Sequence, residues 1–150
     1  MSTKKIIYID MDDTLCQLSN ELTKVRSERG IEFPHAIPEF WLDLPPITNA
    51  ITSVNKLKAD PDFDVYVLTA PSLRNPRSYM EKRLWIEKHF GYEFCEKLII
   101  CSNKGLLRGD YLIDDYDEGK GQENFVGELL HFGSAQYPSW QAIMEKLALI

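Results

Sequence analysis

Residues 6–14 of the chain are Ile-Ile-Tyr-Ile-Asp-Met-Asp-Asp-Thr, an apolar run that ends in a cluster of carboxylates. The four apolar side chains predict a short buried strand. Because side chains alternate faces along a strand, Asp10 and Asp12 are expected to leave its end on the same side. Two carboxylates this close repel each other unless a divalent cation, a shared proton or a lysine lies beside them. The stretch therefore predicts a core strand that ends in a functional site.

Further apolar runs predict a sheet of five strands, at 5–10, 65–69, 97–101, 111–114 and 126–132. Most of these runs are continuous, which is typical of parallel strands buried on both faces. Helical spacing of apolar residues falls between several of them, from Leu15 to Gly30, Ile47 to Asp60, Asn75 to Gly91 and Trp140 to Leu147. This alternation predicts an α/β fold, a Rossmann-like parallel five-stranded sheet flanked by helices.

The interval between the first two predicted strands is more than fifty residues long. A single crossover helix needs far fewer. We therefore expect a core formed by 1–16 and 60–150, with a small helical lid inserted at 17–59. The middle of the lid is rich in aromatic residues and proline, as in Pro38-Glu-Phe-Trp41. A plain surface excursion is the alternative interpretation.

The composition is that of an ordinary globular domain, with 44% hydrophobic and 27% charged residues and a net charge of −6. This acidic balance argues against binding to nucleic acid, which requires a basic face, and against binding to an anionic membrane. We expect neither a signal peptide nor a transmembrane span. Cys16, Cys95 and Cys101 lack metal-binding spacing, and they predict the reduced thiols of a cytoplasmic protein.

Polar side chains gather where the predicted strands end, which is where open α/β sheets bind their ligands. They supply carboxylates, a hydroxyl and an ammonium: Asp10, Asp12, Thr69, Lys104, Asp114 and Asp115. These groups suit phosphoryl transfer. One carboxylate can attack phosphorus, and a second can protonate the leaving alkoxide and then activate water. A hard cation such as Mg²⁺ would offset the charge of the phosphate, and the lysine and hydroxyl would hold its oxygens.

The order of these motifs resembles that of the haloacid-dehalogenase-like phosphohydrolases. The chain is more similar to one branch, the 5'(3')-deoxyribonucleotidases. Four stretches carry this closer resemblance: Tyr8–Thr14, Leu68–Pro71, Glu81–His89 and Gly109–Asp115. The resemblance covers most of the chain, is strong at the motifs and is looser in the lid. It implies hydrolysis of deoxynucleoside monophosphates with Mg²⁺ as cofactor.

The resemblance also implies roles for the carboxylates. Asp10 corresponds to the nucleophile and is a metal ligand. Asp12 corresponds to the general acid/base, and its backbone carbonyl binds Mg²⁺. Asp115 corresponds to the second direct metal ligand, and Asp114 acts through water.

For substrate binding, the resemblance implies that Thr69 and Lys104 hold the phosphate. Phe40 and Trp41 lie where the family has an aromatic pocket for the nucleoside. Ala70 is a departure, because animal relatives carry a serine directly after the threonine. One hydroxyl contact to the phosphate is therefore missing, and backbone N–H groups or Ser72 are the replacements available.

The basic residues that follow Thr69 predict a solvated helix face: Arg74, Arg77, Lys82, Arg83 and Lys88. Arg74 is the exception, because the loop after Thr69 should border the phosphate. The three histidines are predicted to be structural or at the surface, and Trp85 and Trp140 to be core residues.

Two alternative functions remain at this point. The same chemistry could act on another small phosphomonoester, and a receiver-type phosphoacceptor domain uses similar residues around Mg²⁺. Under the leading hypothesis the partner is a small-molecule phosphomonoester, and formation of a homodimer is left open.

Overall fold

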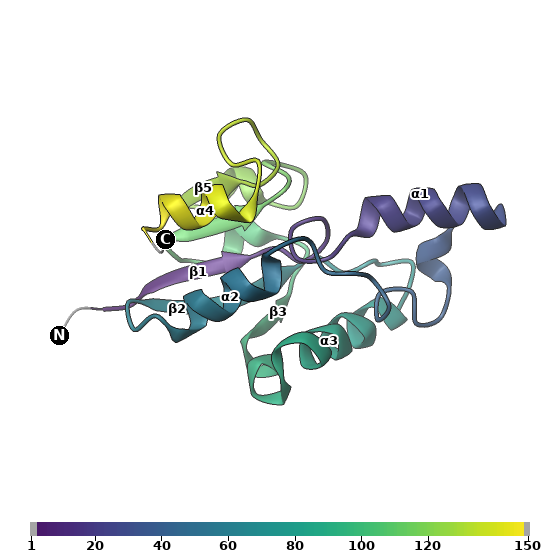
Figure 1. Ribbon diagram of the computed structural model, residues 1–150, viewed down its shortest axis with the longest axis horizontal. Helices are drawn as coiled ribbons and strands as arrows, with labels where there is room; N and C mark the ends of the chain where they lie inside the picture. The colour runs from purple at the N-terminus through teal and green to yellow at the C-terminus, as the bar shows by residue number, and fades with distance from the viewer. Residues whose placement is uncertain (1–2, 149–150) are drawn as a thin grey trace.

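Five parallel strands lie side by side in the order β3-β2-β1-β4-β5 in the computed structural model, which describes residues 3–148 (Figure 1). The strands are β1 (Lys5–Ile9), β2 (Phe63–Thr69), β3 (Leu98–Ile100), β4 (Tyr111–Asp114) and β5 (Glu128–His131). The predicted α/β class with a five-stranded parallel sheet is confirmed. Because β1 pairs with β2 on one side and β4 on the other, the ends of these three strands meet at one edge.

Within residues 3–148, four α-helices accompany the sheet: α1 (Leu18–Arg29), α2 (Ala50–Ala59), α3 (Arg77–Phe90) and α4 (Trp140–Lys146). Short 3₁₀ helices lie in the loops, η1 (Pro34–Ala36), η2 (Tyr92–Lys97), η3 (Lys104–Leu106) and η4 (Gln122–Asn124). The first two α-helices begin three residues later than predicted. Leu15 and Ile47 are instead bound to each other, since the N–H of Ile47 donates to the carbonyl of Leu15 at 2.8 Å.

The larger hydrophobic core lies between one face of the sheet and helices α2, α3 and α4. Trp85 and Trp140 are fully buried there, as predicted. On the opposite face, Tyr8, Leu68, Leu112 and Phe125 form a smaller core beneath the loops that carry η3 and η4. The apolar strands are thus covered on both faces, which explains their continuous hydrophobic runs.

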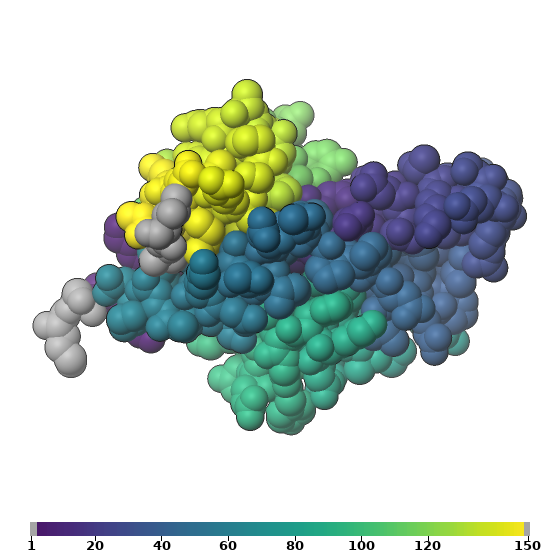
Figure 2. Space-filling model, viewed as in Figure 1, coloured from purple at the N-terminus to yellow at the C-terminus, as the bar shows by residue number. Residues whose placement is uncertain are grey.

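The segment between β1 and β2 divides into two parts with different surroundings. Helix α1 projects past the strand ends, and it has no fully buried residue (Figures 1 and 2). Helix α2 instead packs Ala50, Val54 and Leu57 into the main core. Helix α2 is therefore part of the layer that covers the sheet, while the division of the chain into a core and a lid at 17–59 stays a prediction.

Helix α3 and Asn75, two residues before it, hold the lid segment at three points. Asn75 Nδ2 donates to the carbonyl of His35 at 2.5 Å. The backbone N–H of Trp41 donates to Glu81 Oε1 at 3.1 Å, and Trp85 Nε1 donates to the carbonyl of Leu44 at 2.9 Å. These contacts are long-range in sequence, so the fold of α3 decides where the lid lies over the strand ends. Within the described residues, no helix is long and apolar enough to cross a membrane.

Candidate active site

A cavity of about 370 Å³ lies beyond the carboxyl ends of β1 and β4. Its acidic wall contains Asp10, Asp12, Asp114 and Asp115, the four carboxylates selected from the sequence, together with Asp13. Its other walls are apolar, aromatic or basic, and include Leu18, Leu22, His35, Trp41, Ala70, Pro71, Ser72, Lys104, Tyr116, Lys120 and Gln122. The cavity is large enough for a small ligand.

Lys104 lies between two of the carboxylates and neutralises part of their charge. Its Nζ donates to Asp10 Oδ1 at 2.8 Å and to Asp114 Oδ2 at 2.6 Å, and only 2% of its side chain is exposed. Burial alone would lower the pKa of Lys104, but the charges of Asp10 and Asp114 outweigh it and raise that pKa. The ammonium therefore stays charged. The second oxygen of Asp10 accepts from Thr14 Oγ1 at 3.4 Å.

Asp115 is the carboxylate with the least compensation. Its Oδ1 is buried and has no hydrogen-bond partner among the described residues. Both oxygens of Asp114, in contrast, are bonded: Oδ2 accepts from Lys104, and Oδ1 accepts from the N–H of Tyr116 at 3.0 Å. Burial, the close approach of Asp10 and the charge of Asp114 raise the pKa of Asp115 to about 9.

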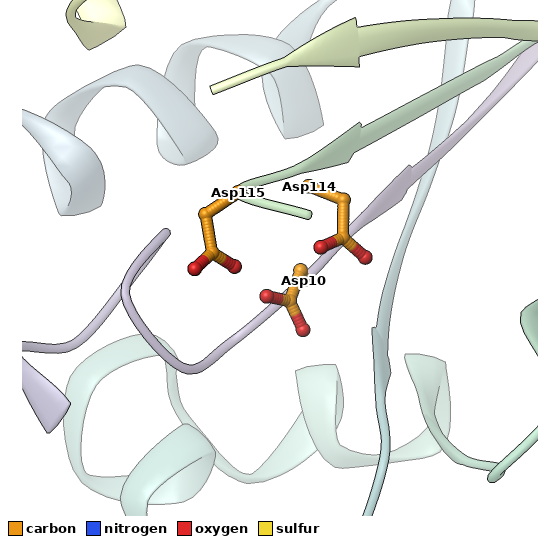
Figure 3. Close-up of side chains that lie close together, drawn as sticks. All are labelled: Asp10, Asp114 and Asp115. Atoms are coloured by element: carbon orange, nitrogen blue, oxygen red, sulfur yellow. The ribbon is translucent and has the colours of Figure 1, made fainter. Parts of the chain in front are cut away.

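The carboxylates of Asp10, Asp114 and Asp115 face one another (Figure 3). One oxygen from each lies within 4.8 Å of the others. Three carboxylate oxygens this close together are the donor set that a hard divalent cation uses, and one oxygen of Asp115 is buried without a hydrogen-bond partner among the described residues. The residues therefore fit Mg²⁺. Among the three carboxylates, Asp115 would gain the most from a bound cation, because neighbouring donors compensate its charge least.

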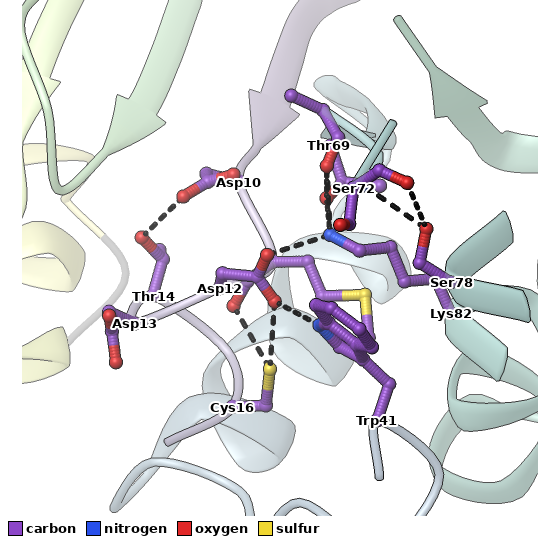
Figure 4. A network of polar contacts seen from close by, with 12 residues as sticks. Asp10, Asp12, Asp13, Thr14, Cys16, Trp41, Thr69, Ser72, Ser78 and Lys82 are labelled. Carbon is purple, nitrogen blue, oxygen red and sulfur yellow. Dashed lines mark hydrogen bonds and ion pairs between the residues drawn. The ribbon is translucent and has the colours of Figure 1, made fainter. Parts of the chain in front are cut away.

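Asp12 has a cationic partner of its own, which sequence reasoning missed. Lys82 Nζ donates to Asp12 Oδ2 at 2.7 Å, to Thr69 Oγ1 at 2.7 Å and to the carbonyl of Ala70 at 2.9 Å (Figure 4). The Lys82 side chain is 0% exposed, so its assignment to a solvated face is wrong. A signal was available: Lys82 precedes Trp85 and Ile86 by three and four residues, and all three lie on the buried face of α3.

The predicted phosphate-binding groups lie on the same edge. Thr69 is the last residue of β2 and is fully buried, and its hydroxyl oxygen accepts a hydrogen bond from Lys82 Nζ. Ala70 and Ser72 line the cavity directly after it. Arg74 is exposed and instead lines a second, smaller cavity with Phe33, His35, Ala36 and Asn75, so the structure does not bring it to the carboxylates.

The two lid aromatics have different surroundings. Trp41 lines the cavity, although only 3% of it is exposed, and its indole N–H donates to Asp12 Oδ1 at 3.0 Å. Phe40 is buried in the main core and lies against Trp41 edge to face, without lining this cavity. His35, predicted to be structural or at the surface, also lines the cavity and contacts the Trp41 ring at a centroid distance of 6.4 Å.

Comparison with known proteins gives a family match. The family model described as "5' nucleotidase, deoxy (Pyrimidine), cytosolic type C protein" matches residues 31–138. A protein of Vibrio phage KVP40, named "Putative 5'(3')-deoxyribonucleotidase", is 31% identical over 147 residues, which cover 96% of this chain and 85% of that protein.

Animal proteins are similar over a shorter span. The human "5'(3')-deoxyribonucleotidase, cytosolic type" is 36% identical over 107 residues, or 71% of this chain and 47% of that protein. A mouse "5'(3')-deoxyribonucleotidase, mitochondrial" is 29% identical over 106 residues, covering 43% of its own length. Because relatives of both cytosolic and mitochondrial types match, the cytoplasmic location stays a prediction.

Substitution of Lys82 tests its buried ion pair. We expect Lys82→Met to lower the free energy of unfolding by about 2–3 kcal/mol, because it leaves the Asp12 carboxylate without its cation. The neighbouring Arg83 is the matched control, because its ion pair with Glu87 is exposed and Arg83→Met should therefore change the free energy of unfolding much less. Urea unfolding measures both, and equal losses would mean that Lys82 contributes no more than a surface residue.

The raised pKa of Asp115 predicts how stability depends on pH without metal. The folded state holds a proton on Asp115 up to pH about 9, whereas the unfolded chain releases it near pH 3.8, the ordinary value. This group therefore makes the protein less stable as pH rises through that window. In thermal melts with chelator, Asp115→Asn should flatten the decline of Tm with pH. Parallel curves for the variant and the wild type would contradict this prediction.

Proposed function

This chain belongs to the 5'(3')-deoxyribonucleotidase family, whose members are phosphoric monoester hydrolases, and on that premise we propose a specific reaction for it. The protein is a Mg²⁺-dependent phosphatase of deoxynucleoside monophosphates that works through an aspartyl phosphate. One observation carries the proposal: the four carboxylates selected from the sequence face a single cavity, and two buried lysines hold three of them.

Asp10 is the proposed nucleophile. It directly follows the central strand β1, and its backbone N–H donates to the carbonyl of Ile113 in β4 at 2.8 Å, which fixes it at the sheet edge. Lys104 holds one of its oxygens and Thr14 the other. In the proposed step an Asp10 oxygen attacks phosphorus, and the electron pair of the broken P–O bond goes to the leaving alkoxide.

Asp12 is the proposed general acid and base. It lies two residues after Asp10 on the same cavity, and 23% of its side chain is exposed. As an acid it gives a proton to the leaving alkoxide, and as a base it then takes one from the water that hydrolyses the acyl phosphate. Lys82 and Thr69 adjoin it, so the phosphate is expected to lie between these groups and Lys104.

Mg²⁺ would be held by Asp10 and Asp115 directly and by Asp114 through water, since one oxygen from each of the three lies within 4.8 Å of the others. When bound, this cation would reduce the negative charge of the carboxylates and the phosphate, so that an anionic nucleophile can approach an anionic substrate.

The nucleoside would occupy the lid side of the cavity. Leu18, Leu22 and Trp41 give that wall an apolar character, and His35 and Tyr116 add flat rings. These groups suit a planar base, which gains about 1–3 kcal/mol from each aromatic stack. Another small phosphomonoester could use the same chemistry, and only assays separate the two. Family membership argues against the receiver-type alternative.

A panel of substrates tests the proposed function. We expect turnover of deoxynucleoside monophosphates with Mg²⁺ and its loss in excess EDTA, because the carboxylates need the cation. Phosphate release is the measurement, with ribonucleotides and sugar phosphates compared in parallel. Full activity in chelator would rule out the metal, and a preference for a sugar phosphate would replace the substrate class while keeping the chemistry.

Asp10→Asn tests the nucleophile. The amide cannot form the acyl phosphate, so turnover should fall by at least about a thousandfold. Asp13→Asn is the matched control: Asp13 lines the same cavity, but both its oxygens accept from Ser19 at the start of α1, so the variant should keep activity within about tenfold. Circular dichroism shows whether both variants fold. Activity of Asp10→Asn within tenfold of the wild type would assign the attack to another group.

A further inference from the structure

The carboxylate of Asp12 accepts hydrogen bonds from two groups that are distant from it in sequence, Lys82 and Trp41 (Figure 4). Lys82 Nζ donates to Oδ2 at 2.7 Å. On the other oxygen, Trp41 Nε1 donates to Oδ1 at 3.0 Å, and the Cys16 thiol lies 3.6 Å from the same atom. Burial raises the pKa of Cys16 well above its ordinary value, so this group remains a thiol that can donate.

Trp41 is itself fixed in place, although it belongs to the lid. Its side chain is 3% exposed, and its backbone N–H donates to the buried Glu81 Oε1 at 3.1 Å. The rings of Phe40 and His35 contact it edge to face. Because Glu81 and Lys82 are consecutive in α3, one turn of this helix anchors both the lid tryptophan and the other oxygen of Asp12.

These donors restrict the positions on Asp12 that can carry the proton that the reaction moves. A carboxylate offers two lone pairs on each oxygen. Trp41 occupies one on Oδ1, and Lys82 occupies one on Oδ2. The Cys16 thiol has one proton, which can go to Oδ1 at 3.6 Å or to the carbonyl of Met11 at 3.5 Å. Oδ2 keeps a lone pair that no donor of the described residues occupies, and we assign the proton to this position.

We infer that Trp41 is a positioning residue: its indole N–H fixes the rotation of the Asp12 carboxylate so that Oδ2 delivers the proton to the leaving alkoxide. This inference rests on the proposed function, because it needs Asp12 to act as the acid. In that step the proton leaves Oδ2 for the ester oxygen as the P–O bond breaks, and Asp12 becomes a carboxylate. The lid thereby contributes to proton transfer in addition to forming a wall of the cavity.

Substrates with different leaving groups distinguish a positioning role of Trp41 from a role in stacking on the base. An alkoxide needs a proton from Asp12, whereas p-nitrophenolate is stable enough to leave without one. Loss of the indole N–H should therefore slow cleavage of every alkyl phosphate, with or without a base, and spare p-nitrophenyl phosphate. Loss of a stacking surface would instead slow only the substrate that carries a base.

The experiment compares Trp41→Phe with the wild type on three substrates: deoxythymidine monophosphate, 2-deoxyribose 5-phosphate and p-nitrophenyl phosphate. Release of the alcohol or phenol is followed in a single turnover, so that hydrolysis of the acyl phosphate does not enter. We expect the rate to fall about ten- to a hundredfold for both alkyl phosphates, the effect of losing a hydrogen bond to a charged group. The rate with p-nitrophenyl phosphate should change by less than about threefold.

Trp85→Phe is the matched control. It also removes an indole N–H from a fully buried tryptophan that binds the lid, but its acceptor is the carbonyl of Leu44. Trp85→Phe should lower Tm in thermal melts. Any change in the single-turnover rate should be the same for all three substrates. If Trp41→Phe does not fold, 3-benzothienylalanine at position 41 keeps the double ring and replaces the N–H with sulfur.

Two results would overturn the inference: an equal fall on all three substrates, or a fall on the nucleotide alone. Both leave the proposed function intact, because the wild type still turns over. A wild-type protein that cleaves neither alkyl phosphate would refute the proposed function, and the inference with it.

Discussion

Compensation of buried charge at the carboxyl edge of the sheet is the constraint on which the rest of the structure depends. Lys82 and Lys104 lose nearly all contact with water, with side chains 0% and 2% exposed. A buried ammonium costs several kcal/mol unless it is paired and fully hydrogen-bonded. The strand ends place the carboxylates within hydrogen-bonding distance of the two lysines. Each buried charge is therefore stabilised by an opposite charge. Replacing a lysine would leave a carboxylate without its cation, and replacing a carboxylate would leave a buried ammonium without its anion.

This pairing divides the edge into two halves with different properties. On one side Lys104 joins Asp10 to Asp114, and Asp115 is left with an unpartnered buried oxygen, which suits a cation. On the other side Lys82 joins Asp12 to Thr69, and Trp41 reaches the same carboxylate from the lid. Nucleophile and acid are therefore neighbours in sequence but have separate partners, which allows two carboxylates to take different roles in the proposed reaction.

The sequence alone was sufficient for the fold class and for the four carboxylates, because both depend on local pattern. Continuous apolar runs mark buried strands, and parallel strands bring their ends together whatever the loops do. Charge alone groups Lys82 with Arg83 on a solvated face, whereas the packing of Trp85 and Ile86 decides which face of α3 is buried. The surroundings of Phe40 and Trp41 depend on Glu81, forty residues further along the chain. A contact between residues this far apart leaves no local sequence pattern from which it could be predicted.

Direct detection of the acyl phosphate tests the central claim, that this edge performs phosphoryl transfer on Asp10. The protein would be mixed with Mg²⁺ and ³²P-labelled deoxynucleoside monophosphate, quenched in acid during turnover, digested and mapped by mass spectrometry. The account predicts label on the peptide that contains Asp10, lost on treatment with hydroxylamine, as expected of an acyl phosphate. Label on another residue, or turnover with no labelled peptide at any quench time, would contradict it.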